Sequence, residues 1–175
     1  GDGLCDAYAL AHALRVGRDA IVHALRDDGR ALWLEPSVGR GVFLHALAHA
    51  NVPRRRIRAL DIDPMPQQSD RNARTLRGVD FLYWSLLSSE RFDRIVANPP
   101  YLGLDELPSE LRAAACGALV PDGLDVPRGA NYWYAFLCAS IALLRPGGAL
   151  GFVLPAAWDY VDYGSRLRKL IATLF

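Results

Sequence analysis

The segment Asn98-Pro99-Pro100-Tyr101 has the residue types needed to hold a flat ring whose amino group is to be alkylated. It follows the apolar run Ile95-Val96-Ala97, which has strand composition, and its two prolines end the strand and stiffen the turn. A residue that precedes proline is kept extended, so Asn98 is fixed at the strand end. The alternative interpretation is a strand followed by a rigid turn, because Pro-Pro turns are common.

An amino group conjugated to an aromatic ring is a poor nucleophile until acceptors around its hydrogens free the nitrogen lone pair. The side-chain oxygen of Asn98 and the backbone carbonyl of Pro99 could supply two such acceptors. The ring of Tyr101 offers a face on which a flat substrate could stack. We therefore treat Asn98, Pro99 and Tyr101 as candidate catalytic residues.

The length and composition describe one globular domain. A chain of 175 residues is about one domain and can bury a substantial core. Hydrophobic residues make up 51% of the chain and charged residues 22%, and no apolar run approaches the roughly 20 residues that cross a membrane. The net charge of +1 gives no sign of the broad basic surface that proteins use to bind nucleic acid. If DNA is the substrate, most phosphate contacts must come from elsewhere.

Three cysteines lie far apart, without the short spacing of a zinc site or a secreted disulfide framework: Cys5, Cys116 and Cys138. No signal peptide is visible at the amino end. We interpret the thiols as reduced and expect a cytoplasmic protein.

Two further clusters are expected to be exposed surface. His45 and His49 lie one helical turn apart, but nothing nearby supplies a third ligand, so we expect a solvated helix face and no metal site. The run Arg54-Arg55-Arg56, followed by Arg58, is a basic cluster of the kind that is usually exposed. We assign it no phosphate contacts.

Apolar and polar segments alternate along the chain as they do in repeated strand and helix units. The expected strands are residues 31–34, 57–60, 79–82, 94–97 and 149–154. The expected helices are residues 21–25, 42–50, about 132–144 and 164–174. The segment Arg145-Pro146-Gly147-Gly148 is expected to end the third of these helices. Residues 102–130 are a stretch punctuated by Pro and Gly. The alternation predicts an α/β fold with a parallel sheet covered on both faces, which binds ligands at the carboxyl ends of its strands.

The amino-terminal residues are expected to be helical as well. Leu4, Tyr8, Ala11 and Leu14 recur at helical spacing. We therefore divide the single domain, residues 1–175, into amino-terminal helices over residues 1–30 and a motif-bearing core over residues 31–175.

Groups suited to a nucleoside ligand follow the first two strands of the core. Gly39 and Gly41 would let the backbone approach a ligand closely. A dinucleotide fingerprint would need a third glycine where the chain has Leu44, which weakens a nicotinamide interpretation. Asp61 ends the second strand about 20 residues beyond the glycines, where a carboxylate can accept both hydroxyls of a ribose. Ile62 beside it could pack on the face of an adenine.

The third expected strand contributes a further pair of groups. Asp80 offers an acceptor for an adenine amino group, and Phe81 offers a backbone donor for the ring. Each carboxylate taken alone could equally be a helix cap or a solvated loop residue. Suitable groups at four strand ends in order are much harder to explain by chance.

Together these motifs resemble the N6-adenine DNA methyltransferases of restriction-modification systems. Because the cofactor motifs precede the catalytic one, the order resembles the gamma arrangement of that family. The resemblance covers nearly all of residues 31–175, and the runs that carry it include Leu34-Glu35-Pro36, Gly39-Arg40-Gly41-Val42-Phe43, Asp61-Ile62-Asp63-Pro64, Asp80-Phe81, Asn98-Pro99-Pro100-Tyr101 and Asn131-Tyr132-Trp133-Tyr134-Ala135-Phe136-Leu137. It implies the class I methyltransferase architecture, a Rossmann-like, doubly wound and mainly parallel sheet.

The resemblance also implies S-adenosylmethionine as the cofactor. Glu35 and the glycine turn, with Gly39 and Gly41, would face the methionine part of this cofactor. Asp61 would hold its ribose hydroxyls.

The adenine of the cofactor would lie, by the same resemblance, between Ile62 and Phe136. Asp80 and Phe81 would read the edge of this ring. No metal ion is needed for the reaction.

For the target, the resemblance implies that Asn98 and Pro99 grip the amino group of an adenine while Tyr101 stacks on the base. A base inside a duplex cannot reach such a pocket, so the family rotates it out of the helix at a cost of roughly a few kcal/mol. Stacking on Tyr101 would offset about 1 to 3 kcal/mol of that cost.

The chain departs from the family at both ends. Residues 1–30 show no Thr-Pro motif of the kind that lies near the cofactor carboxylate, and the chain stops at Phe175, before the last strands and the target-recognition domain. A sheet that ended after its fifth strand would expose an edge able to pair with another chain. We expect a fragment, or one part of a larger assembly, whose grip on DNA comes from a target-recognition domain or subunit outside this chain.

Three alternative functions use the same residues. A protein glutamine amide is also a conjugated amine, but enzymes acting on it usually open the glycine turn with Asp and a Gly-Thr-Gly-like run, unlike Glu35-Pro36-Ser37-Val38. An RNA adenine would fit the same pocket, since the pocket reads a base and not the sugar. A non-catalytic subunit that keeps the fold is the third alternative.

Overall fold

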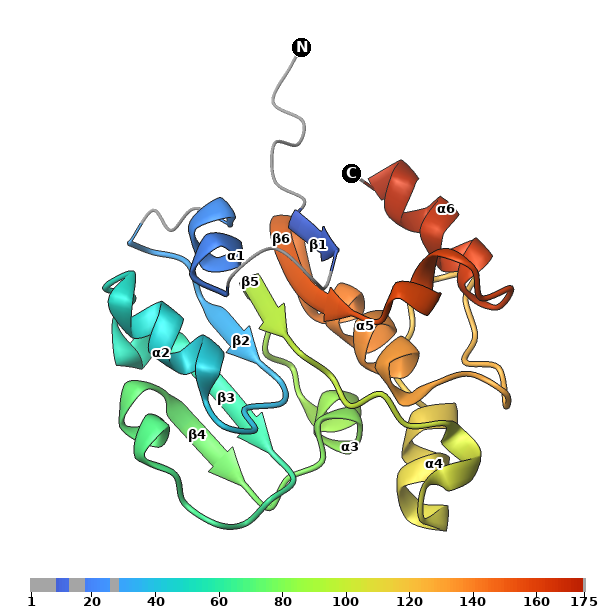
Figure 1. Cartoon of the computed structure of the whole chain (residues 1–175), viewed down its shortest axis with the longest axis horizontal. Coiled ribbons are helices and arrows are strands. Elements are labelled where there is room, and N and C mark those ends of the chain that lie inside the picture. Colours follow the sequence, from blue (N-terminus) through green and yellow to red (C-terminus); the bar gives the residue numbers. More distant parts are fainter. Residues whose placement is uncertain (1–8, 13–17, 26–28, 175) are drawn as a thin grey trace.

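The computed structural model describes residues 9–12, 18–25 and 29–174. In this part of the chain a six-stranded sheet is flanked by helices (Figure 1). Its strands are β1 (Ala9–His12), β2 (Trp33–Glu35), β3 (Ile57–Asp61), β4 (Arg74–Arg77), β5 (Phe92–Ala97) and β6 (Leu144–Leu154). All neighbouring pairs are parallel, and the strand order is β1-β6-β5-β2-β3-β4.

The chain changes direction across the sheet beside β2. From β2 it runs outward through β3 to β4, and it then returns to the other side of β2 to form β5 and β6. The junction of β2 and β5 pairs Trp33 with Arg94 and Leu34 with Ile95. Open parallel sheets bind their ligands beyond the carboxyl ends of the strands at such a switch point.

Six α-helices occur in the described residues: α1 (Arg18–Ala24), α2 (Val42–His49), α3 (Phe81–Leu87), α4 (Ser109–Cys116), α5 (Tyr132–Leu143) and α6 (Gly164–Leu174). Four short 3₁₀ helices are also present there: η1 (Arg54–Arg56), η2 (Gln68–Asn72), η3 (Leu104–Glu106) and η4 (Ala156–Asp159). Of the helices in the described segments, none combines the length and the apolar character that a membrane crossing requires.

Alternating side chains of the strands divide the core into two layers. Trp33 and Val96 are buried in the layer that α1 and α2 cover. Leu34 and Ile95, their neighbours in sequence, are buried in the opposite layer, with α3 and α5. Because successive strand residues face opposite sides, β2 and β5 are apolar on both faces. The predicted α/β class with a doubly wound parallel sheet is confirmed.

The helix predicted over Leu4 to Leu14 is wrong for the part that the structure describes. Ala9 to His12 form β1 instead, paired in parallel with residues 151–154 of β6; positions 4, 8 and 14 lie outside the described residues. Strand pairing fills the backbone hydrogen bonds along β6, and this outweighs a short helical periodicity. The expectation that β6 would be an open edge is therefore also wrong, because β1 covers it.

The third strand of the core was predicted in the wrong place. β4 ends at Arg77, whereas Asp80 is the N-cap of α3 and accepts a hydrogen bond from the Tyr83 backbone N–H at 2.8 Å. Phe81, Leu82 and Ser85 are buried at helical spacing, not at the spacing of a strand. β4 escaped notice because it is an edge strand with little buried surface.

The remaining core elements agree with the sequence analysis. Strands β2, β3 and β5 and helices α2, α5 and α6 lie where they were predicted, within a few residues at their ends. β6 ends at Leu154 as predicted but begins at Leu144, before the predicted start at residue 149. α4 lies inside the stretch that was interpreted only as punctuated by Pro and Gly. α5 ends at Leu143, and the Arg145-Pro146-Gly147-Gly148 segment belongs to an irregular start of β6, where the register against β5 shifts.

Candidate active site

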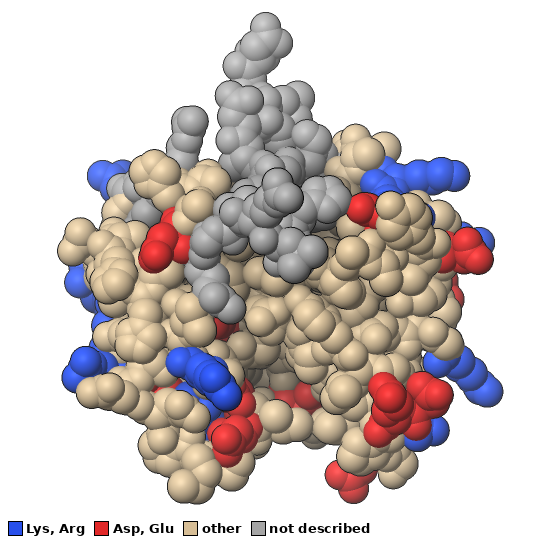
Figure 2. Space-filling model, in the orientation of Figure 1, with Lys and Arg blue, Asp and Glu red and all other residues tan. Residues whose placement is uncertain are grey.

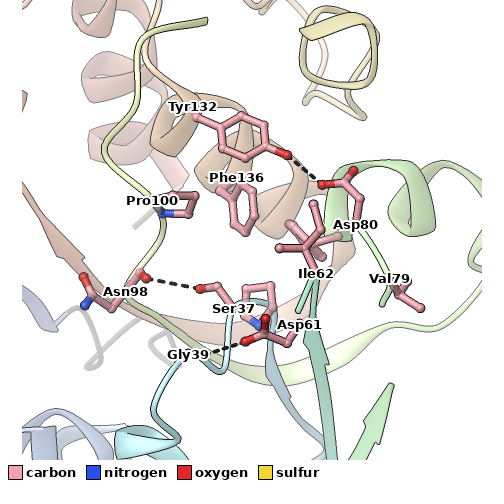
Figure 3. Close-up of a pocket in the computed structure, with 12 residues that line it drawn as sticks. Ser37, Gly39, Asp61, Ile62, Val79, Asp80, Asn98, Pro100, Tyr132 and Phe136 are labelled. Atoms are coloured by element: carbon pink, nitrogen blue, oxygen red, sulfur yellow. Dashed lines mark hydrogen bonds between the residues drawn. The ribbon is translucent and has the colours of Figure 1, made fainter. Parts of the chain in front are cut away.

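A cavity of about 240 Å³ opens at the carboxyl ends of β2, β3 and β5, at the switch point of the sheet (Figure 3). Residues from the turn after β2, from the end of β3, from the start of α3, from the tip of β5 and from α5 form its wall. Seven of the predicted site residues line it: Gly39, Asp61, Ile62, Asp80, Phe81, Asn98 and Phe136. The structure thus brings together groups that the sequence separates by almost 100 positions.

The glycine turn after β2 takes a backbone conformation that favours glycine. The φ angle is 51° at Gly39 and 71° at Gly41, both in the left-handed region. A Cβ at Gly41 would overlap the side chain of Ser69, which belongs to η2. Gly41 does not line the cavity. It shapes the turn by letting η2 pack closely against it.

Asp61 ends β3 and turns its carboxylate toward the glycine turn. One oxygen accepts a hydrogen bond from the Gly39 backbone N–H at 2.5 Å, and the other accepts from the Asp63 N–H at 2.8 Å. Figure 3 shows the carboxylate at the floor of the cavity, beside Gly39. Asp61 is buried, and its remaining lone pairs are available to hydroxyl donors.

Arg77, which was not among the predicted site residues, supports Asp61 from the neighbouring strand. Its guanidinium lies 3.4 Å from the Asp61 carboxylate and donates to Asp70 at 2.7 Å. Burial alone would raise the pKa of Asp70, but hydrogen bonds from Arg77 and from the Gln67 backbone hold it below its ordinary value. The register of β3 and β4 pairs Arg77 with Asp61, so a correct placement of β4 would have revealed the contact.

Glu35, a predicted cofactor-binding residue, ends β2 and is not among the residues that line the cavity. It is 1% exposed, and its Oε2 atom has no hydrogen-bond partner. Burial, and then the negative charge of Asp61, raise the pKa of Glu35 well above its ordinary value, although Arg77 lowers it in part. A buried carboxylate with a free oxygen is suited to a cationic ligand group, which would supply the missing partner.

Apolar side chains form the opposite end of the cavity. Ile62 is 53% exposed at its mouth, while Phe136 and Phe81 are buried. The rings of Phe81 and Phe136 lie 4.9 Å apart and are tilted against each other. A flat ring entering this end would therefore find an aliphatic group and an aromatic group on the wall.

Asp80 binds two groups of the protein at once. One carboxylate oxygen caps α3 through the Tyr83 N–H, and the other accepts a hydrogen bond from the Tyr132 hydroxyl at 2.6 Å. Burial, followed by the bond to Asp80 and its charge, raises the pKa of the Tyr132 phenol far above its ordinary value. Tyr132 lines the cavity, although no sequence pattern placed it among the site residues.

Asn98 joins the tip of β5 to the glycine turn. Its side chain is exposed, and its backbone carbonyl accepts a hydrogen bond from the Ser37 hydroxyl at 3.2 Å (Figure 3). Ser37 also lines the cavity. The backbone carbonyl of Asn98 therefore faces the glycine turn, whereas Figure 3 shows the side-chain amide, which carries the predicted acceptor, pointing away from Ser37.

The Tyr101 hydroxyl is within hydrogen-bond distance of the Asn98 side chain. This hydroxyl lies 2.8 Å from the Asn98 Oδ1 atom and 2.9 Å from the Val153 carbonyl at the end of β6. One hydroxyl proton can serve one of these acceptors at a time. Tyr101 is 44% exposed and lies outside the cavity wall, whereas Pro99 is buried beneath the turn and Pro100 lines the cavity.

The clusters without assigned chemistry lie away from the cavity. His45 and His49 are exposed on α2, as predicted. Among the described side chains, no group of three or more His, Cys, Asp or Glu could hold a metal ion. Arg54 and Arg55 are exposed, while Arg58 pairs with Glu90 at 2.9 Å.

Two of the three cysteines fall within the described residues. Cys116 is an exposed free thiol and Cys138 is a buried one, so neither forms a disulfide. Burial raises the pKa of the Cys138 thiol to about 12. Cys5 lies outside the described residues.

A comparison with protein families identifies the family of this chain. Residues 32–175 match the model of the Eco57I restriction-modification methylases. The chain belongs to the Eco57I restriction-modification methylase family. The match includes every residue that lines the cavity. Methyl transfer is the chemistry of this family, and S-adenosylmethionine is the cofactor.

Relatives with known names fall into two groups. The type II methyltransferase M.TthHB8I of Thermus thermophilus is 36% identical over 149 residues, which are 79% of this chain and 32% of the relative. A release factor glutamine methyltransferase of Moorella thermoacetica is 39% identical over 147 residues, which are 75% of this chain and 47% of the relative. The chain thus spans about a third to a half of the length of these relatives.

A solved structure supports the class I fold. The crystal structure of a class I S-adenosylmethionine-dependent methyltransferase from Listeria monocytogenes matches with a TM-score of 0.58 at 15% identity. The match covers 85% of this chain and 46% of that chain. At this identity the likeness speaks for the fold alone.

Proposed function

We propose that residues 1–175 are the catalytic domain of a cytoplasmic enzyme that methylates the N6 amino group of adenine in DNA, with the target base rotated out of the duplex. One observation carries this proposal: Asn98 lines the same cavity as Asp61 and Asp80. The residue that carries the proposed acceptor for a target amine thus borders the same space as two carboxylates suited to a nucleoside. A methyl donor and its target can meet there.

The protein groups around the cavity fit the cofactor. S-adenosylmethionine supplies a methyl group that the positive charge of its sulfonium already activates. Asp61 would accept the ribose hydroxyls, and Ile62 and Phe136 would enclose the adenine. The free oxygen of buried Glu35 suits the ammonium group of the methionine part, because a cation would complete its missing contact. Gly39 would let the backbone approach the same part closely.

Asn98, Pro99 and Tyr101 would act on the target amine. Donation of its two hydrogens to the Asn98 Oδ1 atom and the Pro99 carbonyl would leave the nitrogen lone pair free for attack. The exposed ring of Tyr101 would stack on the base. These groups fix position and charge, and such positioning can supply most of the rate when the leaving group is already activated.

The proposed DNA substrate requires phosphate contacts from outside this chain. The net charge is +1, and Figure 2 shows Lys and Arg side chains scattered around the rim of the visible face, with carboxylates gathered at its lower right. Affinity for DNA depends mainly on contacts between basic side chains and phosphates. We therefore propose that a target-recognition domain or partner subunit supplies them.

The test uses DNA in which rotation of the base costs least. An adenine opposite an abasic site is already unpaired, so the isolated chain should methylate it even if it leaves an intact duplex untouched. The reaction is followed by transfer of labelled methyl groups from S-adenosylmethionine. In the Asn98→Ala variant, transfer should disappear while calorimetry shows unchanged affinity for the cofactor. Unchanged transfer by this variant would remove Asn98 from the mechanism.

A second candidate substrate is a protein glutamine, which the Moorella thermoacetica relative favours. It differs from adenine because its amide has no ring to stack on Tyr101. The same assay with a glutamine-containing peptide, and with RNA of the same sequence as the DNA, separates the substrates. Transfer to the peptide and not to the DNA would overturn the proposal for adenine.

A further inference from the structure

Tyr132 and Asp80 are joined by a hydrogen bond on the wall of the cavity. The Tyr132 hydroxyl donates to the Asp80 carboxylate at 2.6 Å across 52 positions of the sequence (Figure 3). Both residues line the cavity, and the Tyr132 side chain is buried at its back. The contact links the first turn of α5 to the N-cap of α3.

The pair holds the carboxylate of Asp80 at both of its oxygens. The Oδ1 atom accepts from the Tyr83 backbone N–H at 2.8 Å, and the Oδ2 atom accepts from Tyr132. An ionised carboxylate oxygen accepts more than one hydrogen bond, so Oδ2 keeps room for one donor from the cavity. A carboxylate that is fixed at both ends cannot rotate to bind a ligand that offers a different pattern of donors.

The ring of Tyr132 also fixes the apolar part of the wall. It lies 5.1 Å from the ring of Phe136 in an edge-on arrangement. The burial of its phenol, together with its bond to Asp80, keeps the hydroxyl protonated and therefore a donor. Tyr132 thus orients both an acceptor and an aromatic face.

We infer that Tyr132 determines the specificity of this site for a 6-aminopurine cofactor. It does so by holding Asp80 as an acceptor for the 6-amino group. A cofactor with a 6-oxo group would present an oxygen to the carboxylate, and a site built around a hydrogen bond discriminates strongly against a ligand that cannot make it. This inference rests on the proposed position of the cofactor adenine beside Asp80.

The chain offers a matched control for the hydroxyl of Tyr132. Tyr134 lies on the same helix and is also buried, but its ring packs against Trp133 and Tyr163, and it does not line the cavity. Tyr132→Phe and Tyr134→Phe each remove one buried hydroxyl from α5. Only the first removes a partner of Asp80.

The experiment measures the binding of two product analogues by calorimetry on the whole chain. S-adenosylhomocysteine carries the 6-amino group, and S-inosylhomocysteine carries a 6-oxo group in its place. For Tyr132→Phe, we expect the affinity for S-adenosylhomocysteine to fall about tenfold, as for a lost hydrogen bond to a charged group. The affinity for S-inosylhomocysteine should change less than about twofold, so the preference for the amino analogue shrinks. Tyr134→Phe should leave that preference as in the parent.

Other outcomes overturn the inference in distinguishable ways. If Tyr132→Phe weakens both analogues equally, Tyr132 serves the fold and not specificity. Asp80→Asn tests the position of the adenine separately. A loss of preference in Asp80→Asn but not in Tyr132→Phe overturns the role of Tyr132 and leaves the adenine position standing. An unchanged preference in both variants overturns the adenine position and this inference with it.

Discussion

Arg77 lies opposite Asp61 in the paired strands β3 and β4, and its guanidinium is 3.4 Å from the Asp61 carboxylate. The same guanidinium holds Asp70, the N3 residue of a capping box at the start of η2. The Gly39 N–H binds Asp61 in turn, and η2 packs against Gly41. One arginine therefore connects the glycine turn, the end of β3 and η2.

Arg77→Gln should destabilise the fold and weaken cofactor binding together. The substitution leaves the buried Asp61 and the largely buried Asp70 without their cation, which should lower the free energy of unfolding by about 3 kcal/mol. Loss of the contact that orients Asp61 should weaken binding of S-adenosylmethionine about tenfold. Urea unfolding and calorimetry measure the two effects. Arg74→Gln, an exposed position of the same strand, should change stability by less than about 0.5 kcal/mol.

Strands could be predicted from the sequence where both of their faces are buried, because such strands are continuous apolar runs. β2, β3, β5 and the carboxyl-terminal half of β6 are apolar runs because helices cover both sides of the sheet. β4 has a single neighbour, and its sequence Arg74-Thr75-Leu76-Arg77 carries no such run. The four residues of β1 give no strand signal without β6 beside them.

Site residues could be predicted where they lie at the ends of parallel strands, because the strand order alone brings these ends together. Gly39, Asp61 and Asn98 follow parallel strands, so their meeting at one edge of the sheet needed no further information. Tyr132 and Arg77 were missed because their partners come from other elements. The bond from Tyr132 to Asp80 depends on how α5 packs beside α3, which no local pattern records.

Glu35→Gln should stabilise the chain near neutral pH while weakening cofactor binding. Burial and the charge of Asp61 raise the pKa of Glu35 in the folded chain. The stability that its proton confers is full below the unfolded pKa of about 4.5 and is lost as the pH rises through the folded pKa. Glutamine does not titrate, so the variant should lose less stability between about pH 5 and pH 8. Urea unfolding over this pH range measures the difference.

The exposed Glu110 on α4 provides the control for Glu35. Glu110→Gln should keep the pH dependence of the parent, because it leaves the buried carboxyl group of Glu35 in place. If the stability of Glu35→Gln follows the parent at every pH, the carboxyl group of Glu35 titrates normally and the argument from its burial fails.

Tyr101→Phe should methylate at least as fast as the parent. The Tyr101 hydroxyl and the proposed target amine are both donors to the Asn98 Oδ1 atom, so they compete for it. Phenylalanine keeps the stacking face and removes the competitor. Tyr101→Ala removes the face as well and should lose about 1 to 3 kcal/mol of base binding. Rates on the abasic-site DNA measure both variants, and a large loss in Tyr101→Phe would show that the hydroxyl assists the reaction.

Gly41→Ala should destabilise the chain more than the same change at another glycine with positive φ. The φ angles of Gly41 and Gly123 are 71° and 80°, so alanine is strained at both positions, by about 1 to 2 kcal/mol. At Gly123 the added Cβ meets nothing within 4 Å, whereas at Gly41 it overlaps Ser69. Thermal and urea unfolding should therefore rank the variants as parent, Gly123→Ala and Gly41→Ala, in order of falling stability.

A second substitution separates the overlap at Gly41 from the backbone strain. Ser69→Gly removes the atoms that the new Cβ would meet, so Gly41→Ala combined with Ser69→Gly should lose less than the sum of the two single changes. Gly41→Ala should also weaken cofactor binding, because it displaces the turn that contains Gly39, and the double variant should recover part of this affinity because η2 could again pack against the turn. Strict additivity in both measurements would mean that η2 moves freely away from the turn and does not shape the cofactor site.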